Sequence, residues 1–400
     1  MIIAALAAFS FWRGGIDLTA VFIEMYRIAD MPALSAIPLF AFTGFLLAES
    51  DAARRLVRVS ETLLGWLPGG LAIMALAACA LLTAFTGASG MTIVALGGLL
   101  YPALRQSGYP ENFSLGLLTT AGSRGLLFPP SLALIMYGIV SGTPIDRLFI
   151  AAIAPGMLLL LALAAYCFAM GRRHAVRPAR VSLAAALTAL REFSLELLLP
   201  IVVITGIYGG FIAISEAAAL SALYVFIVEV IVHREIRLRQ LPGIMRETMV
   251  LVGSILIILG ASLAYTNYMI DAEVPQQLLA YMQSHVSNRF VFLILLNIFL
   301  LAVGCLIDMF SALVVVVPLI LPIAVAYDIH PIHLGIIFLT NLEIGYSTPP
   351  VGLNLFIASA RFERPILRLY WASLPFLLIL LAGLLVITYV PQLSLFAVVD

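Results

Sequence analysis

The stretch Gly122-Ser-Arg-Gly-Leu-Leu-Phe-Pro-Pro-Ser131 interrupts an apolar segment that begins at Phe113 and continues to Gly142. Proline lacks a backbone donor and disfavours α-helical geometry in the residue before it, so a helix through this segment must open at Pro129 and Pro130. Inside a lipid bilayer, an opened helix leaves backbone polar groups without partners unless protein or a hydrated cavity surrounds them. The stretch therefore predicts a broken membrane helix whose break is enclosed by the protein.

The same interruption occurs 220 residues later, as Gly345-Tyr-Ser-Thr-Pro-Pro350. At this offset Gly125 corresponds to Gly345, and four of the seven prolines between Pro68 and Pro155 fall on another proline. Composition alone would give about 0.4 such coincidences, so the offset indicates an internal repeat. Two interrupted apolar segments at corresponding positions of two halves are typical of the central binding site of secondary transporters.

Composition places the whole chain in a membrane. Hydrophobic residues make up 63% of its 400 residues, charged residues make up only 10%, and the mean hydropathy is +1.13. Soluble domains carry about 25% charged residues, so these values indicate an all-α polytopic membrane protein. The formal net charge is zero, and we therefore expect no nucleic-acid partner.

Each half also contains a pair of apolar runs that are too short to span a bilayer separately. In the first half, runs 71–85 and 91–104 flank Thr86-Gly-Ala-Ser-Gly90, whose small and hydroxyl residues suggest the tip of a re-entrant hairpin. At the 220-residue offset, runs 292–305 and 312–326 flank a second tip. Each half is thus expected to hold a re-entrant hairpin, a broken helix and one full span, the spans lying at 148–170 and 367–390.

The remaining chain is expected to form a scaffold with surface arms. Apolar runs predict further spanning helices at 33–47, 197–214, 217–232 and 249–270. Arginines on one face and apolar residues on the other predict amphipathic helices along the membrane surface at 51–67, 183–191 and 234–248. Segment 1–12 is too short to span and lacks the cleavage site of a secretory signal, and 18–28 has mixed polarity.

These features divide the chain into four regions. The predicted regions are an N-terminal scaffold with an arm (1–67), a first repeat (68–171), a linker with scaffold helices and arms (172–291), and a second repeat (292–400). If the hydrophilic linker 171–180 is cytoplasmic, sixteen arginines fall on that side and four fall outside, as the positive-inside rule requires. The first hairpin then enters from the cytoplasm and the second from outside. The repeats are therefore predicted to be inverted, as alternating access requires.

Polar groups at the tips and breaks are candidate ligands for a coupling cation, because such groups are costly inside a membrane. Asp308 offers a hard carboxylate oxygen, although it could instead cap a helix start. The opened backbones are expected to supply free carbonyls. Oxygen donors without soft ligands suit Na⁺ better than zinc or copper. The predicted sodium ligands are Thr86, Gly87, Ser89, Ser123, Gly125, Asp308, Ser311, Gly345 and Thr348.

The ends of the broken helices favour an anionic substrate, because half-helix N-termini carry partial positive charge. Arg124 adds a full cation in the first break and is a candidate contact for a substrate carboxylate. The alternative is an internal ion pair with Glu343, which lies one position from the repeat equivalent of Arg124. Ser131, Asn341 and Asn354 flank the breaks and are candidates for binding substrate or for satisfying the opened backbone.

The chain resembles the large membrane subunit of TRAP (tripartite ATP-independent periplasmic) transporters over nearly its whole length. Four stretches carry the resemblance, and the last is highly specific: Ala41-Phe-Thr-Gly-Phe-Leu-Leu-Ala-Glu49, Thr119-Ala-Gly-Ser-Arg-Gly-Leu-Leu-Phe-Pro-Pro130, Gly210-Phe-Ile-Ala-Ile-Ser-Glu-Ala-Ala-Ala219 and Asn341-Leu-Glu-Ile-Gly-Tyr-Ser-Thr-Pro-Pro-Val-Gly-Leu-Asn354. The chain departs from the family at Arg124, where an aliphatic residue is usual, and at Thr86-Gly-Ala-Ser89, a variant of the usual Gly-Ser-Ala tip.

The resemblance implies an elevator-type ion-transporter fold that uses Na⁺ to drive uptake of an organic acid across a bacterial inner membrane. It also implies two partners, a small four-helix membrane subunit and a periplasmic binding protein that delivers the substrate. Its sodium sites would pair each hairpin tip with the nearby break, which here means 86–90 with 123–125 and 308–311 with 345–348. The acid itself is not specified by this chain, because the binding protein does most of the choosing.

No covalent chemistry and no cofactor beyond the coupling ion are expected. One alternative is a stand-alone Na⁺- or H⁺-coupled di- or tricarboxylate carrier of the same fold, which would move substrate without a binding protein. A second is an intramembrane enzyme, which would need clustered carboxylates or a basic phosphate cradle that the sequence does not show. A channel is disfavoured because two inverted, hairpin-tipped repeats suit a moving carrier.

Overall fold

The computed structural model describes residues 32–64, 67–174, 183–286 and 288–398, with four isolated residues before them. Within these ranges the chain is helical, without strands. Six of the described helices are long and apolar enough to cross a membrane, or up to eight if each of two bent pairs forms one span. The all-α membrane class is thus confirmed. The predictions for segments 1–12 and 18–28 fall outside the continuous ranges.

The first half begins with a helical hairpin that turns at Gly87. The backbone φ of Gly87 is +62°, a value that glycine adopts without strain. An interrupted helix follows, and it bends by 46° at the break. The elements are α5 (Gly70–Thr86), α6 (Ser89–Gln106), α7 (Glu111–Ala121), the 3-10 turn η3 (Arg124–Leu127), α8 (Leu132–Ser141) and the long span α9 (Ile145–Arg173).

The second half repeats this order. Helix α15 starts behind an Asn288 cap and α16 behind an Asp308 cap, because each side chain accepts backbone N–H groups of the first turn. The elements are α15 (Arg289–Leu306), α16 (Met309–Ala326), α17 (Pro331–Gly345), α18 (Leu353–Phe362), α19 (Ile366–Tyr389) and the short α20 (Gln392–Leu395). Both Pro-Pro peptide bonds, one in each break, are cis.

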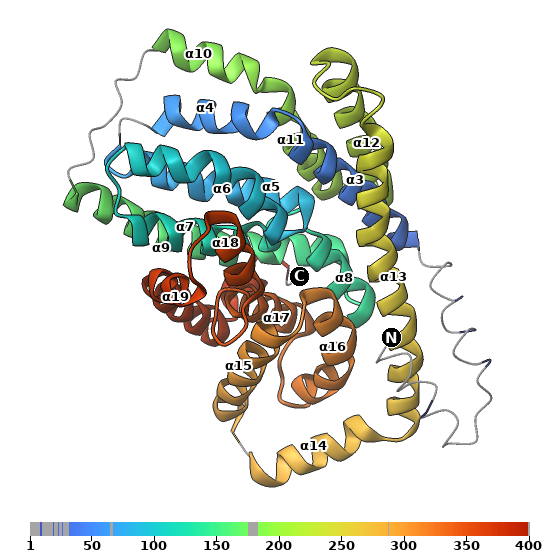
Figure 1. The fold of residues 1–400 in the computed structure, drawn as a ribbon. Helices are drawn as coiled ribbons and strands as arrows, with labels where there is room; N and C mark the ends of the chain where they lie inside the picture. The colour runs from blue at the N-terminus through green and yellow to red at the C-terminus, as the bar shows by residue number, and fades with distance from the viewer. Residues whose placement is uncertain are drawn as a thin grey trace.

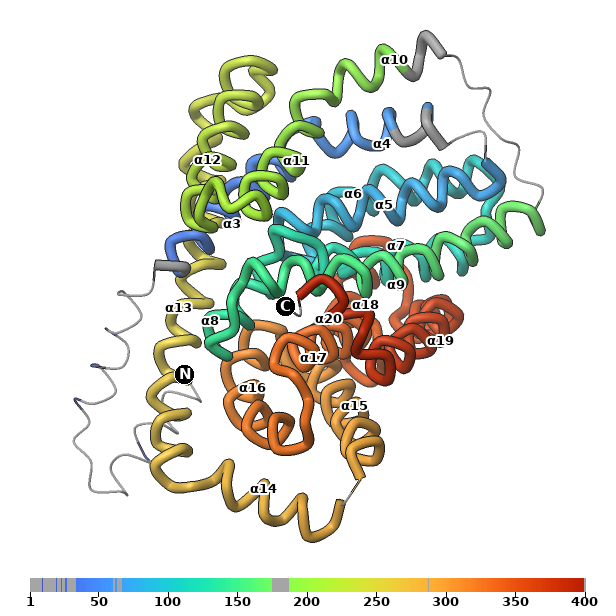
Figure 2. The backbone as a smooth tube through the Cα atoms, turned by 180° about the vertical axis from the view of Figure 1, so that it is seen from behind, coloured from blue at the N-terminus to red at the C-terminus, as the bar shows by residue number. Residues whose placement is uncertain are grey.

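The two halves pack against each other reciprocally (Figures 1 and 2). The second helix of each hairpin lies against the half-helix after the other break, so that α6 contacts α18 and α16 contacts α8. The helix before each break lies against the last span of the other half, so that α7 contacts α19 and α17 contacts α9. Neither half can therefore bury its hairpin or its broken helix without the other.

A scaffold of further helices runs along one side of the two halves. The long helix α13 lies at the edge of the molecule in Figure 1, where it contacts both α3 and α16. The scaffold elements are η2 (Pro32–Ser35), α3 (Ala36–Glu49), α11 (Ser194–Tyr208), α12 (Ile214–Phe226) with its π-helical end η4 (Ile227–Val232), α13 (Leu241–Asp271) and α14 (Val274–His285).

Two amphipathic helices, α4 (Ala52–Leu64) and α10 (Leu183–Glu192), lie side by side as arms (Figures 1 and 2). The chain bends by 71° between α3 and α4, which turns the first arm away from the axis of α3. Val59 of α4 packs against Ala189 of α10 and the adjacent Phe193 in a small apolar cluster. The two arms predicted around 51–67 and 183–191 are therefore present as helices.

Arg55 fixes the first arm to the scaffold. Its Nε donates to Oε1 of Glu196 on α11 at 2.6 Å, and its Nη2 donates to both carboxylate oxygens of Glu229 in η4 at 3.0 and 3.1 Å. Its Nη1 pairs with Glu235, whose other carboxylate oxygen accepts from the backbone N–H of Asp51. Burial lowers the pKa of Arg55, but the three carboxylates outweigh this effect and raise its pKa above the ordinary value. Arg55 therefore stays charged.

One prediction about the scaffold is wrong, and one scaffold helix was missed. The arm predicted at 234–248 is not a separate helix, because α13 runs without interruption from Leu241 to Asp271 and contains no proline after its first turn. The prediction divided one helix at the change from a polar to an apolar composition, which alters the surroundings of a helix but does not end it. Helix α14 was not predicted at all, because its sequence mixes polar and apolar residues too evenly to stand out.

Candidate functional site

The first break lies against the first helix of its own hairpin. A Cβ atom at Gly125 would lie 2.1 Å from the carbonyl oxygen of Ala80, so only glycine allows η3 to approach α5 this closely. The hydroxyl of Thr83 donates to the carbonyl of Gly122 at 2.7 Å and lies 2.6 Å from the hydroxyl of Thr92 on α6. Because Thr83 has a single hydroxyl hydrogen, Thr92 is the donor of that second bond.

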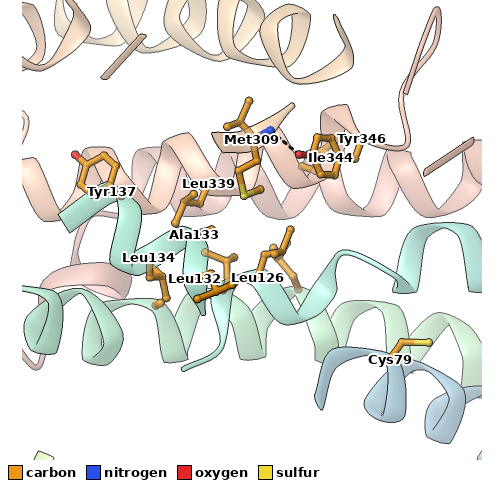
Figure 3. Packing of buried hydrophobic residues seen from close by; sticks show 14 of the residues in the cluster. Cys79, Leu126, Leu132, Ala133, Leu134, Tyr137, Met309, Leu339, Ile344 and Tyr346 are labelled. Atoms are coloured by element: carbon orange, nitrogen blue, oxygen red, sulfur yellow. Dashed lines mark hydrogen bonds between the residues drawn. The ribbon is translucent and has the colours of Figure 1, made fainter. Parts of the chain in front are cut away.

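The second break is held to the second hairpin in a similar way. A Cβ atom at Gly345 would lie 2.7 Å from the Cα atom of Gly304, so α17 and α15 meet at two glycines. The backbone N–H of Gly352 donates to the carbonyl of Cys305 at 3.0 Å. At the hairpin tip, the backbone N–H of Met309 donates to the hydroxyl of Tyr346, the bond drawn as a dashed line in Figure 3.

Several of the carbonyls that were predicted to be free accept backbone hydrogen bonds. In the first break, the carbonyl of Ser123 accepts the N–H of Leu126 at 3.1 Å, and that of Gly125 accepts the N–H of Phe128 at 2.9 Å. In the second, the carbonyl of Gly345 accepts the N–H of Thr348 at 2.9 Å. Tight i-to-i+3 turns thus satisfy these three carbonyls locally. Each carbonyl keeps one lone pair that a cation could still use.

The structure joins the first hairpin tip to the helix that follows the second break. The hydroxyl of Ser89 donates to Oδ1 of Asn354 at 2.7 Å, although 265 positions separate the two residues. Asn354 also reaches the carbonyl of Thr119 on α7 with its Nδ2 at 3.4 Å. A predicted sodium ligand and a predicted substrate contact are therefore immediate neighbours. The neighbouring tip residue Thr86 is also fully buried.

Arg124 and Glu343 connect the first break to α17. Both side chains are buried, with exposures of 2% and 1%, and Nη1 of Arg124 lies 3.2 Å from Oε2 of Glu343. Nε of Arg124 donates to the carbonyl of Thr120 at 3.2 Å, and Nη2 donates to the hydroxyl of Ser123 at 3.0 Å. That hydroxyl is also 3.3 Å from the carbonyl of Glu343. The internal ion pair is thus the arrangement that the structure shows.

Asp308 sits at the exposed tip of the second hairpin and caps α16. Its Oδ1 accepts the backbone N–H groups of Phe310 and Ser311 at 3.0 and 3.1 Å, and its Oδ2 accepts the hydroxyl of Ser311. The helix-cap alternative is therefore present in the structure. A capping carboxylate is still a hard oxygen ligand, so the cap does not decide whether a cation also binds there.

The other predicted substrate contacts have internal partners. The hydroxyl of Ser131 accepts the backbone N–H of Ala133 at 3.2 Å and so caps α8. Asn341 donates to Oδ1 of Asn297 on α15 at 2.7 Å, and Asn297 in turn donates to the hydroxyl of Thr388 on α19 at 3.1 Å. Asn341 thus belongs to a buried polar chain between α15, α17 and α19, separate from the tips.

Sequence reasoning missed several polar residues of this centre. Thr83, Thr92 and Tyr346 make the hydrogen bonds that hold each hairpin to its break, and Asn297 partners Asn341. Asn297 could have been found, because an amide inside the apolar run of residues 292–305 is unusual in a membrane. The threonine hydroxyls gave no signal, because threonine is common in membrane helices and often bonds only to its own helix.

These features define the class of protein. Two interrupted helices meet inside a membrane bundle, each is held to a helical hairpin, and an intramembrane ion pair and a hydroxyl–amide contact lie between them. The first break is buried except at Phe128, whereas the second is exposed from Pro349 to Val351. Irregular backbone that is enclosed by protein, as in the first break, is typical of the binding site of a secondary transporter. The fold and the site are therefore those of a membrane transport protein.

The chain belongs to the DctM family of tripartite ATP-independent periplasmic transporters, whose family model matches residues 1–393. It is 35% identical over 375 residues to the C4-dicarboxylate TRAP transporter large permease protein DctM of Pseudomonas aeruginosa, a match that covers 93% of this chain and 88% of that protein. It is a transport protein rather than an enzyme, and a multi-pass protein of the inner membrane.

Two further comparisons agree with this family and with a transporter fold. The chain is 33% identical over 371 residues to the isethionate TRAP transporter permease protein DctMQ of Oleidesulfovibrio alaskensis, covering 92% of this chain and 58% of that longer protein. The crystal structure of the YdaH transporter of Alcanivorax borkumensis shares the fold with a TM-score of 0.61 at 14% identity, covering 91% of this chain and 88% of that one.

Proposed function

We propose that this chain is the membrane-embedded subunit of a Na⁺-coupled importer of an organic acid. The observation that carries the proposal is the convergence of the first hairpin tip, the first break and the helices on either side of the second break on one buried region. Ser89 of the first tip contacts Asn354 beyond the second break, and Arg124 of the first break contacts Glu343 before the second. A region that segments of both halves share changes when the segments move relative to one another, which is what a carrier requires.

The proposal includes two inverted repeats and an elevator-type movement. Three observations support the repeats: the 220-residue offset, the matching order of elements, and the reciprocal contacts of α6 with α18 and α16 with α8. The arginine asymmetry supports their opposite orientation. The arms α4 and α10, anchored through Arg55, would hold the scaffold while the hairpins and broken helices move.

Sodium is proposed as the coupling ion because the available donors are oxygens. At the first tip and break the candidate ligands are Thr86, Gly87, Ser89, Ser123 and Gly125. At the second they are Asp308, Ser311, Gly345 and Thr348. The side chains of Asp308 and Ser311 are hydrogen-bonded to each other. The backbone N–H of Met309, next to Asp308, donates to the hydroxyl of Tyr346 in the second break.

The substrate class is proposed to be a small organic anion. The names of three relatives specify C4-dicarboxylate, isethionate and sialic acid, which are organic anions. Two others specify ectoine, a zwitterion that also carries a carboxylate. In this chain the N-terminal ends of α8 and α18 follow the two breaks and carry partial positive charge toward the shared region. Asn354, at the start of α18, and Ser131, at the start of α8, are the proposed hydrogen-bonding contacts.

Two partners complete the proposed transporter. The family is one component of a tripartite system, and the DctMQ relative is longer than this chain. We infer that a small four-helix membrane subunit and a periplasmic binding protein act with this chain. The inner-membrane bundle described here would receive the acid from the binding protein and release it into the cytoplasm.

Reconstitution of the chain with its small subunit in proteoliposomes tests this function. The binding protein is purified, its bound acid is identified by mass spectrometry, and uptake of that acid is measured. Uptake should require both an inward Na⁺ gradient and the binding protein. Sodium-driven uptake without the binding protein would instead support the stand-alone carrier, and uptake that ignores sodium would contradict the coupling.

A further inference from the structure

Arg124 is surrounded by oxygen atoms of three kinds. Its guanidinium donates to the carbonyl of Thr120 and the hydroxyl of Ser123, and it lies at ion-pair distance from the carboxylate of Glu343. Carbonyl, hydroxyl and carboxylate oxygens are also what a bound sodium ion would take as ligands in this fold. The guanidinium therefore occupies a place whose chemistry suits a small cation.

The contact with Ser123 makes the overlap specific. Ser123 is a candidate sodium ligand of the first break, and its hydroxyl oxygen accepts Nη2 of Arg124 at 3.0 Å. The same hydroxyl lies 3.3 Å from the carbonyl of Glu343, which it uses as an acceptor. The hydrogen and one of the two lone pairs of this hydroxyl are therefore engaged, and the cation that takes this lone pair is a side chain of the protein itself.

When Glu343 is ionised, charge balance favours a cation at this place. Glu343 is 1% exposed, and among the described residues Arg124 is the cationic side chain that pairs with it. A buried carboxylate without a counter-ion is strongly unfavourable inside a membrane. Nη1 of Arg124 lies 3.2 Å from Oε2 of Glu343 but lacks hydrogen-bond geometry, so charge rather than a directed bond links the pair.

We propose that Arg124 is a tethered cation that takes the place of one coupling sodium ion at the first break. The inference rests on the proposed sodium coupling and refines it. Mobile sodium would then bind at the second tip and break, around Asp308 and Thr348, while the guanidinium permanently neutralises Glu343. Arg124 is consequently a positioning residue for the two breaks, and its charge is not available to a substrate carboxylate.

Sodium binding to the purified full-length chain tests the proposal without any substrate. Radioactive sodium binding is counted per protein, and thermal unfolding is followed in sodium chloride against choline chloride at constant ionic strength. Arg124→Gln leaves Glu343 without its counter-ion and should bind one more sodium ion than the wild type, with a larger sodium-dependent rise in Tm. Arg124→Lys keeps a cation, and the Arg124→Gln, Glu343→Gln double variant keeps neutrality, so both should bind the wild-type number.

The outcomes separate this inference from the proposed function. Wild-type protein that binds no sodium would contradict the sodium coupling itself. If the wild-type protein binds sodium and Arg124→Gln binds the same number of sodium ions per protein, only the inference that Arg124 replaces a sodium ion would be overturned. If Arg124→Gln is recovered folded in sodium but not in choline, the inference is supported. If sodium fails to rescue its folding while the double variant folds, the inference is overturned.

Discussion

Asp308 shows how one side chain can serve both the fold and the ion. It accepts two backbone N–H groups at the start of α16 and a hydroxyl from Ser311, so part of its role is structural. Asparagine is as good an N-cap residue as aspartate, so Asp308→Asn should keep the cap and remove only the charge. Substitution by asparagine therefore separates the two roles, which substitution by alanine would not.

We expect Asp308→Asn to unfold within about 0.5 kcal/mol of the wild type, as substitutions that preserve local bonds usually do. The sodium concentration for half-maximal stabilisation should rise at least tenfold, equivalent to about 1.4 kcal/mol of binding free energy. Sodium titrations of Tm measure both quantities. Asp146→Asn, in the exposed first turn of α9, is the matched control. An unchanged sodium titration in Asp308→Asn would remove this carboxylate from the site.

The site was only partly predictable from single residues. The ion pair of Arg124 with Glu343 was one of two alternatives, because the 220-residue offset already placed the two charges at equivalent breaks. The contact of Ser89 with Asn354 could not be predicted, because it joins residues 265 positions apart through the packing of α6 on α18. The carbonyls of Ser123, Gly125 and Gly345 were predicted to be free but accept hydrogen bonds, because short 3-10 turns satisfy part of an opened backbone locally.

At the scale of elements, the close approach of the second break to its hairpin depends on two glycines, Gly304 and Gly345. A Cβ atom at Gly345 would lie 2.6 to 2.9 Å from backbone atoms of Gly304 and Cys305, which cannot move aside as a flexible side chain would. Gly345→Ala should therefore push α17 away from α15 and cost about 1–3 kcal/mol through overpacking. It should also reduce uptake, because the second tip and break would no longer meet.

Gly253→Ala is the control for this prediction. Gly253 lies inside α13 with open space around its Cβ position, so alanine should be neutral or stabilise the helix by about 0.5–1 kcal/mol. Thermal unfolding and uptake of both variants give the comparison. Equal Tm values for Gly345→Ala and the wild type would show that the close packing of α15 on α17 is not required.

The attachment of the arm α4 to the scaffold depends on Arg55. Three carboxylates, those of Glu196, Glu229 and Glu235, share this one guanidinium, so Arg55→Ala leaves buried like charges without a counter-ion. Removing one partner from a buried ion pair costs about 3–5 kcal/mol. We therefore expect Arg55→Ala to lower the Tm strongly and to release α4 from the scaffold, which limited proteolysis of the arm would detect.

Arg58→Ala provides the contrast on the same helix. Its pair with Glu192 is 63% and 40% exposed, and exposed pairs contribute only about 0–1 kcal/mol. If Arg55→Ala and Arg58→Ala lowered the Tm by comparable amounts, the overall positive charge of α4, rather than the buried ion-pair network of Arg55, would be what attaches the arm to the scaffold.

At the scale of the whole molecule, the sequence predicted the architecture because lipid constrains it so strongly. Helices, hairpin turns and breaks all had to follow the apolar runs, and the repeat offset then placed the second half from the first. The scaffold was harder, since neither the continuity of α13 nor the presence of α14 is required by the repeat. The reciprocal packing of the two halves emerges only from the structure.

The central claim is that the two halves have opposite orientations in the membrane. A carrier with alternating access can then expose the same binding site first to one side and then to the other. The ends of the two hairpins provide suitable positions. Ser107 follows α6 and Ala326 ends α16, and both are exposed. The native cysteines Cys79, Cys167 and Cys305 are buried, which keeps the labelling background low.

The most direct measurement labels Ser107→Cys and Ala326→Cys with a membrane-impermeant maleimide, before and after the inner membrane is permeabilised. Ala326→Cys should react from the periplasmic side in intact spheroplasts, and Ser107→Cys should react only once the reagent reaches the cytoplasm. Labelling of both cysteines from the same side would mean that the halves are parallel, and it would contradict the account of a carrier built from inverted repeats.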